Sequence, residues 1–454
     1  MEKLRLDIIL IGILFFGALQ VAAEAQTSSF NKQKLDTYID TLAQNQKVMG
    51  SLAIDSAGHT VFRKAWGYRN LGNDTLFANT ETEYRIGSIT KMFTATMIFQ
   101  LMEEKKLSLS TKLVEFYPQI PKADSITIGN MLHHQSGIFN FTNAPEYRDY
   151  MTEKRTKEQM LKVFRNQESQ FSPGAQTSYS NTNYVLLGYI IEKITGDSYA
   201  NQLRERIVQP LNLGHTYYGN GIDRQKNEAA SFRRESGRWK PMPETDMSIP
   251  GGAGALVSTP SDLIRFIRAL FDGQLVSQES LDHMTDFESG LGMGMMKVPF
   301  YDTFAYGHSG GIDGFQSSLY YFPEKDVTLA FIGNAMDYKM NDVLIGTLSI
   351  YFGRDFTIPT LARKELTIRP NEMKRYVGEF SSDQVPMEIK VFVEEGTLKA
   401  QATGQPAFPL TATSKTTMRF DPAGLVMEFD SLKVGSYQQF TLKQGGGSFI
   451  FQRN

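Results

Sequence analysis

The sequence predicts an α+β protein whose larger sheet-and-helix part is followed by a small all-β part. From Phe30 to about Leu361, strand-like patterns lie near both ends and mostly helical or loop sequence lies between them. After about Arg363, apolar segments become short, partly alternate and are separated by glycine, proline or polar turns. The first pattern indicates one sheet built from both ends of a domain, with a helical insert. The second indicates a small barrel or sandwich.

Apolar spacing and the residues that begin or end each segment define the elements of the first part. Helical patterns are expected at Phe30–Val48, at Ile89–Met102, from near Asn183 to Gly196, from near Pro260, and at Met340–Tyr351. Strand patterns are expected at Ser51–Asp55, Thr60–Tyr68, Phe315–Phe322 and Val327–Ile332. Turn residues join the first two of these strands, and the last two, into hairpins.

The C-terminal part contains only short strand patterns. They are expected at Met387–Val393, Leu398–Ala402, Leu425–Phe429, Tyr437–Leu442 and Phe449–Phe451. This part contains no histidine, so we expect no histidine-dependent site there.

Composition and charge limit the classes of partner that we expect. The chain has 454 residues, 41% hydrophobic and 21% charged residues, and a net charge of -2. These values describe a globular protein, with no electrostatic reason to bind nucleic acid or an anionic membrane surface. We therefore expect a small-molecule or peptide substrate. The absence of cysteine excludes disulfides, thiolate nucleophiles and thiolate metal sites.

The N-terminus has the organisation of a signal peptide. Lys3 and Arg5 precede an apolar run over Ile8–Val21, and the small residues of Ala23–Ala25 follow it. We expect residues 1–25 to be removed before Gln26 and the protein to be periplasmic or secreted in a bacterium. The alternative is an uncleaved anchor, although the run is shorter than the roughly 20 residues of a membrane span. No later segment is long and apolar enough to cross a membrane.

Two common kinds of site are not expected. The six histidines form no H-E-x-x-H or comparable cluster, and the adjacent His133 and His134 point apart on most backbones, so we expect no metal or other cofactor. Gly307–Gly311 matches the G-x-S-x-G nucleophile elbow, which requires a following helix and a later triad histidine. A strand-like run follows Ser309, and no histidine follows His308. The elbow is therefore excluded.

Ser88 and Lys91 are the strongest catalytic candidates. Ser88 begins a helix that is apolar on almost every side, where free backbone N–H groups favour developing negative charge. Lys91, three residues on, lies on the same face one turn deeper. Burial would lower the pKa of its amine and make it a proton acceptor beside a nucleophile. The alternative is that Ser88 only caps the helix and that Lys91 is solvated.

Two further motifs accompany this pair. "SPGAQTSYSNTNYVLLGYIIEKITG" contains Tyr179-Ser180-Asn181, and "GHSGGIDGF" contains His308-Ser309-Gly310. With Ser88-Ile89-Thr90-Lys91, they make the sequence from roughly Val48 to Asn334 resemble the serine β-lactamase and penicillin-binding superfamily. The resemblance is greatest to its class C β-lactamase, D-alanyl-D-alanine carboxypeptidase and family VIII esterase branch. It implies the β-lactamase/transpeptidase-like antiparallel sheet with a helical insert.

The resemblance also implies roles. Ser88 would form an acyl-enzyme, and Lys91 and Tyr179 would share the proton transfers, with the identity of the base left open. Asn181 would orient Lys91 or the substrate. The backbone N–H groups of Ser88 and Gly311 would bind the oxyanion.

His308, Ser309 and Gly310 would form one wall of the cleft as an edge strand, with glycine allowing close approach of the substrate. His308 stands where many relatives carry lysine, and His133 and Gln135 also depart from the family pattern. His134 takes the place of the family histidine, with a structural role. Separately considered, Tyr179 is also compatible with a buried phenol, Asn181 with a helix cap, and residues 308–311 with a strand followed by a glycine turn.

The sequence thus predicts a serine hydrolase domain over residues 26–362 and a lipocalin-like all-β domain over residues 363–454. The expected activity is that of a peptidase acting on D-amino-acid or D-Ala-D-Ala substrates, or of an esterase. The alternatives are a true β-lactamase and a penicillin-binding sensor without turnover. The substrate carries an amide, lactam or ester carbonyl. Its identity, the oligomeric state and the role of the C-terminal domain stay open.

Overall fold

The computed structural model describes residues 30–72, 75–288, 290–361, 366–420, 423, 425–444 and 447–454. The chain forms two compact units, the first ending at Pro359 and the second beginning at Thr360. The predicted signal peptide at residues 1–25 and the predicted boundary between residues 362 and 363 lie outside the described residues.

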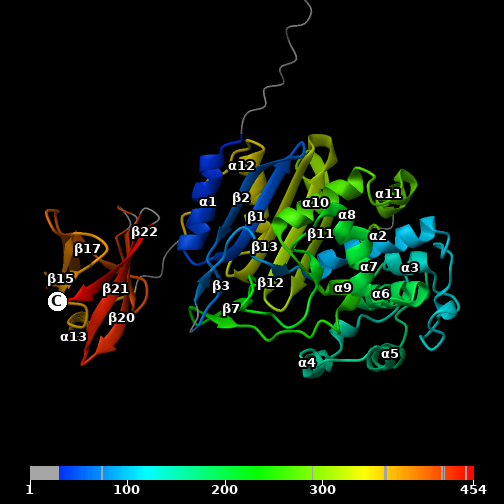
Figure 1. Cartoon of the computed structure of the whole chain (residues 1–454), viewed down its shortest axis with the longest axis horizontal. Coiled ribbons are helices and arrows are strands. Elements are labelled where there is room, and N and C mark those ends of the chain that lie inside the picture. Colours follow the sequence, from blue (N-terminus) through cyan, green and yellow to red (C-terminus); the bar gives the residue numbers. More distant parts are fainter. Residues whose placement is uncertain are drawn as a thin grey trace, which may run out of the picture. The chain divides into compact units, whose positions relative to one another are not determined.

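An eight-stranded sheet forms the centre of the first unit, with the main strand order β10-β11-β12-β13-β1-β2 (Figure 1). These strands are β1 Val48–Ser56, β2 His59–Trp66, β10 Met296–Phe300, β11 Thr303–Ile312, β12 Phe315–Phe322 and β13 Val327–Met336. Neighbours along this order pair antiparallel. Because β1 pairs with β13, the sheet joins the two ends of the unit, which confirms the predicted fold class.

Helices cover both faces of this sheet (Figure 1). Helices α1 Lys32–Gln44 and α12 Met340–Tyr351 lie on one face, and α10 Pro260–Phe271 lies on the other. Along β1, every residue from Val48 to Asp55 is buried. A strand covered on both faces does not alternate polar and apolar residues. Its ends are therefore hard to recognise in the sequence, and the predicted strand Ser51–Asp55 was too short.

Helix boundaries follow local capping chemistry. The side chain of Asn31 accepts a hydrogen bond from the Lys34 N–H at 2.8 Å and begins α1. The Thr259 hydroxyl caps α10 in the same way, and Pro260 occupies its first turn. The predicted first helix was too long at its C-terminal end, because Val48 belongs to β1.

The helical insert lies between β2 and β10. Its two longest helices are α2 Thr90–Glu103 and α6 Asn181–Thr195, and α6 ends at the left-handed Gly196. The shorter helices are α3 Ile128–Leu132, α4 Tyr147–Tyr150, α5 Lys157–Arg165, α7 Tyr199–Leu203, α8 Gln209–Leu211, α9 Gly251–Gly254 and α11 Gln278–Met284. The minor strands are β3 Tyr68–Asn70, β4 Leu76–Phe77, β5 Tyr84–Arg85, β6 Tyr217–Tyr218, β7 Phe232–Glu235, β8 Arg238–Pro241 and β9 Leu256–Ser258.

The second unit is a nearly closed, barrel-like sheet of nine strands. Its elements are α13 Pro370–Met373, β14 Gly378–Ser381, β15 Glu388–Glu394, β16 Thr397–Ala402, β17 Phe408–Pro409, β18 Thr411–Ala412, β19 Thr417–Phe420, β20 Leu425–Lys433, β21 Ser436–Gln444 and β22 Gly447–Arg453. The five predicted strands correspond to β15, β16, β20, β21 and β22. Its apolar core includes Phe380, Met427 and Phe440. Among the described residues, no helix is long and apolar enough to cross a membrane.

Candidate active site

Ser88 lies on a tight turn beside the edge of the sheet. It belongs to the 3-10 segment Gly87–Ile89, which directly precedes α2, and it is partly exposed. Gly87 has a φ of +52°, and a Cβ atom there would lie 2.8 Å from the backbone nitrogen of Gly311. Only glycine satisfies both conditions. The serine is therefore presented on a turn that presses against β11.

Lys91 lies behind Ser88 and is fully buried. Its Nζ donates to Asn181 Oδ1 at 2.8 Å and to the Ala253 carbonyl oxygen at 2.8 Å, and it lies within hydrogen-bond distance of Ser88 Oγ, at 2.9 Å. Burial holds the pKa of this amine well below its ordinary value of 10.5. The alternative of a solvated lysine is therefore wrong, and the amine is poised to accept a proton from the serine.

Tyr179 completes the group around Ser88. The centre of its ring lies 4.9 Å from Lys91 Nζ. Burial raises the pKa of the Tyr179 phenol above its ordinary value of 10.0, and a hydrogen bond with Ser88 partly opposes that rise. The phenol is therefore protonated at neutral pH. Burial has opposite effects on the two neighbours, because it raises the pKa of the phenol and lowers the pKa of the Lys91 amine.

Asn181 connects this group to the helical insert. It is the first residue of α6, whose N-cap position belongs to Ser180. Its backbone N–H donates to Asn140 Oδ1 at 3.0 Å, and its Nδ2 donates to Thr142 Oγ1 at 3.2 Å. These bonds direct the amide oxygen at Lys91. The helix-cap alternative for Asn181 is therefore wrong, and its geometry is that expected of a residue that orients Lys91.

The third motif lies in β11. Strand β10 pairs only with residues 303–307 of β11, so the half that contains the motif pairs with β12 alone. The predicted edge strand is present in this half. A side chain on Gly310 would collide with the carbonyl oxygen of Ile86, just before the serine turn. Gly310 thus admits the Ser88 segment, whereas we expected it to admit the substrate.

The other two residues of this motif have separate surroundings. His308 is buried, and its Nδ1 donates to the carbonyl oxygen of Ser309. Burial and the nearby charge of Lys91 lower the pKa of His308 to about 3. Ser309 forms a side-chain hydrogen bond with Tyr320. His308 is therefore neutral and contributes no fixed positive charge.

His134 contacts Tyr179 and both of its neighbours in the chain. Its ring stacks on the Tyr179 ring with 4.4 Å between centroids. Its Nδ1 accepts the Ser180 N–H at 3.1 Å, and its carbonyl oxygen accepts the Ser178 N–H at 2.9 Å. His134 adopts a left-handed φ of +57°. We expected only a structural role for His134, and no pattern in the sequence predicted that its ring would stack on Tyr179.

A cleft of about 950 Å³ opens in front of Ser88. Of the predicted site residues, Ser88, Asn181 and Gly311 line it, while Lys91, Tyr179, His308, Ser309 and Gly310 do not. Further lining comes from α4, β7 and the segments 242–245 and 311–316. The cleft thus receives Ser88 from the 3-10 turn before α2, Asn181 from α6 and Gly311 from β11, three segments that lie far apart in the sequence.

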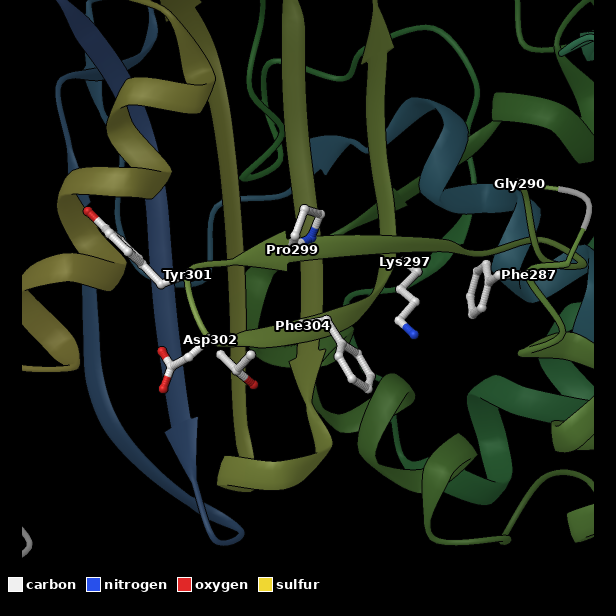
Figure 2. A pocket seen from close by; sticks show the side chains of 8 residues that line it. Phe287, Gly290, Lys297, Pro299, Tyr301, Asp302 and Phe304 are labelled. Carbon is white, nitrogen blue, oxygen red and sulfur yellow. The ribbon is translucent and has the colours of Figure 1, made fainter.

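A second hollow, of about 510 Å³, lies on the β10–β11 hairpin and contains none of the predicted site residues. Figure 2 shows Lys297, Phe287 and Phe304 close together in its lining, with Tyr301 farther away at the turn of the hairpin. Lys297 Nζ lies 4.0 Å from the centre of the Phe304 ring. No nucleophile and base meet there.

The family model described as Beta-lactamase matches residues 35–347, which is most of the chain. The chain belongs to the beta-lactamase family. Its relatives in this family include hydrolases, and the present member is a serine hydrolase.

One curated relative of this beta-lactamase-family protein is the teichoic acid D-alanine hydrolase of Staphylococcus aureus. The two are 25% identical over 308 residues, 66% of this chain and 72% of that protein. Among solved structures, D-amino acid amidase from Ochrobactrum anthropi SV3 complexed with D-phenylalanine is 26% identical, with a TM-score of 0.63. The match covers 71% of this chain and 98% of the amidase.

The octameric penicillin-binding protein homologue from Pyrococcus abyssi is also 26% identical, with a TM-score of 0.63. That match covers 92% of this chain and 100% of the other. The resemblance inferred from the sequence motifs is therefore confirmed, and so is the fold class of this beta-lactamase-family protein.

Proposed function

We propose that this protein hydrolyses an amide or ester of a D-amino acid through an acyl-enzyme on Ser88. The observation that best supports this reaction is the hydrogen bond of 2.9 Å between the buried Lys91 Nζ and Ser88 Oγ. A lowered pKa makes Lys91 the base in its neutral form. Positioned proton transfer of this kind typically contributes about 10²–10⁴ in rate.

In the acylation step, Ser88 Oγ bonds to the substrate carbonyl carbon while its proton passes to Lys91. The bond to the leaving nitrogen or oxygen then breaks, and that atom takes a proton from the Tyr179 hydroxyl, which Lys91 replenishes. In deacylation, a water oxygen bonds to the acyl carbon while one of its protons passes to the pair of Lys91 and Tyr179. The bond between the acyl carbon and Ser88 Oγ then breaks, Oγ takes the proton back from that pair, and the acid product leaves. The protonated phenol of Tyr179 supports its role as the donor.

The oxyanion in both steps would lie between the backbone N–H groups of Ser88 and Gly311. The close approach of the Ser88 turn to Gly311 supports this assignment. Donors of this kind typically contribute about 10²–10³ each. Lys91, Tyr179 and Ser88 would thus carry the proton transfers, and the edge of β11 would stabilise the developing charge.

The relatives support D-aminoacyl substrates. A D-amino acid amidase cleaves an amide and a teichoic acid D-alanine hydrolase releases D-alanine, as their names state. The neutral His308 leaves no fixed charge for a carboxylate next to the scissile bond. We therefore favour D-aminoacyl amides and esters over β-lactams and D-Ala-D-Ala termini.

For the chain organisation, we propose export after removal of residues 1–25, a hydrolase domain to residue 362 and a lipocalin-like domain from residue 363. Mass spectrometry of the protein secreted by a bacterial host tests the first point. A mature N-terminus at Gln26 is expected, and retention of Met1 in the exported protein would contradict it.

The catalytic proposal is tested by labelling with a fluorescent fluorophosphonate and by hydrolysis assays. We expect the label on Ser88, its absence in Ser88→Ala, and faster hydrolysis of D-alanine p-nitroanilide than of its L-isomer. Rapid turnover of nitrocefin without action on D-alanyl substrates or p-nitrophenyl acetate would make the protein a true β-lactamase. A penicillin adduct that persists, without hydrolysis of any substrate, would make it a sensor.

A further inference from the structure

The charged side chains that line the cleft are Arg148, Arg233 and Asp313. The Asp313 side chain is fully buried and accepts a hydrogen bond from Arg85 at 2.7 Å. Its other oxygen accepts the Thr245 hydroxyl at 2.7 Å. The carboxylate is therefore satisfied inside the protein, and the charge that the cleft offers to a substrate is positive.

Arg148 has no ion pair within the described part of the chain. It is exposed on α4 and lines the cleft. Glu146 and Asp149 lie close to it in sequence, but neither forms an ion pair with it and neither lines the cleft. An arginine that faces a cleft without a carboxylate partner is available to an anionic ligand.

Arg233 approaches the same cleft from β7. Its guanidinium forms an ion pair with Glu235, and the two side chains are 59% and 37% exposed. Glu235 also lies 3.7 Å from Lys240 Nζ of β8. Exposed ion pairs of this kind are weak, and Lys240 keeps Glu235 compensated when Arg233 turns to a ligand. Both arginines can therefore bind an anion in the cleft.

The positive charge of the two arginines is separate from the reacting centre at Ser88. Close to Ser88, Lys91 is buried and His308 is neutral, so neither offers an exposed cation. The cleft volume of about 950 Å³ is at the upper end of the range of about 300–1,000 Å³ for small-ligand pockets. Apolar side chains such as Phe141 and Phe315 also line it. The cleft thus fits a substrate much larger than a free amino acid amide.

We propose that the substrate carries a carboxylate or phosphate away from the scissile carbonyl, and that Arg148 and Arg233 bind it. This inference rests on the proposed hydrolase function and narrows its substrate class to anionic D-aminoacyl compounds. Arginine suits either anion, because its planar fork donates two parallel hydrogen bonds to oxygens of a carboxylate or a phosphate.

Three D-alanyl esters with similar leaving groups test the proposal: those of glycerol 3-phosphate, glyceric acid and glycerol. We expect kcat/KM to be about tenfold or more higher for at least one anionic ester than for the neutral ester, as for loss of a charge-assisted hydrogen bond. Whichever anionic ester is preferred identifies phosphate or carboxylate. Arg148→Gln and Arg233→Gln should each remove most of this preference, because kcat/KM should fall far more for the preferred anionic ester than for the glycerol ester.

Arg165→Gln is the matched control, because Arg165 is exposed on α5 and does not line the cleft. Equal kcat/KM for charged and neutral esters, or equal losses for all three in the arginine variants, would overturn the proposal. Calorimetric binding of the three esters to Ser88→Ala measures the anion preference without turnover. Absence of fluorophosphonate labelling on Ser88 would refute the hydrolase mechanism, whereas absence of charge preference in binding would refute the anion site.

Discussion

Lys91 and Lys297 lie beside the two hollows of the same unit, yet their amines have opposite surroundings. Lys91 is fully buried and forms hydrogen bonds with three oxygen atoms, one of which is Ser88 Oγ. Lys297 is exposed and lies over the Phe304 ring (Figure 2). Burial penalises the charged form of the Lys91 amine. The same side chain is therefore a candidate base beside Ser88, whereas in the second hollow it contacts an aromatic ring.

Replacement of the two lysines by methionine should separate these roles most strongly. Lys91→Met removes the proton acceptor of Ser88, so kcat/KM for D-alanine p-nitroanilide should fall by about 10³–10⁴. Lys297→Met should leave kcat/KM within about twofold, because its amine touches no reacting group. Steady-state kinetics measures both. Similar losses of kcat/KM in the two variants would show that Lys91 has no special role in the reaction.

Tyr179→Phe should give the next largest effect. The variant keeps the ring that stacks on His134 and loses the hydroxyl that bonds to Ser88, so kcat should fall by about 10²–10³ while KM changes little. Tyr306→Phe is the matched control, since Tyr306 stacks on Phe287 beside the second hollow. A full burst of labelled acyl-enzyme in Tyr179→Phe at the wild-type rate would contradict the proposed donor.

His134 should have a smaller, positional effect. In His134→Ala, loss of the stack and of the acceptor for the Ser180 N–H should lower kcat by about tenfold. Histidine and asparagine also adopt the left-handed region more readily than alanine, so His134→Ala should lose some stability as well. His134→Asn supplies an acceptor oxygen and tolerates the left-handed region, so it should recover part of kcat and most of the stability. If His134 had a purely structural role, His134→Asn would recover stability and activity to the same extent, and the pH profile of kcat would be the same in both variants.

The buried His308 should produce a pH-dependent stability change. Its pKa is lowered from 6.5 to about 3 in the folded protein. Below pH 6.5, His308 therefore binds a proton in the unfolded chain, whereas in the folded chain it stays neutral down to about pH 3. The free energy of unfolding should fall as pH decreases across this window, and less steeply in His308→Gln. Urea titrations at several pH values measure the slope.

Leu319 pairs with His308 across β11 and β12, and it is buried but carries no titratable group. Leu319→Ala therefore provides the control, because it should lower the free energy of unfolding without changing its slope against pH. Equal slopes for the wild type and His308→Gln would show that burial of this imidazole contributes nothing to the acid sensitivity of the fold.

Local sequence chemistry determined most elements of the fold. The apolar run after Ser88 predicted α2, and the cap at Thr259 with Pro260 predicted α10. The strand pattern at residues 315–322 predicted β12 with the bounds that the structure has. Strands β17 and β18, each of two residues, were missed because they are too short to show a period.

Tertiary packing decided the site itself. The sequence placed Ser88 and Lys91 on one helical face, since three residues span about one turn. It contained no signal that the Ala253 carbonyl would meet the Lys91 amine, or that Arg148 and Arg233 would face the same cleft. Helical and strand periods encode neighbours within a few residues, whereas these contacts join segments far apart in the chain. They form only when the insert and both ends of the sheet pack together, because burial of their apolar surfaces brings the polar groups into one place.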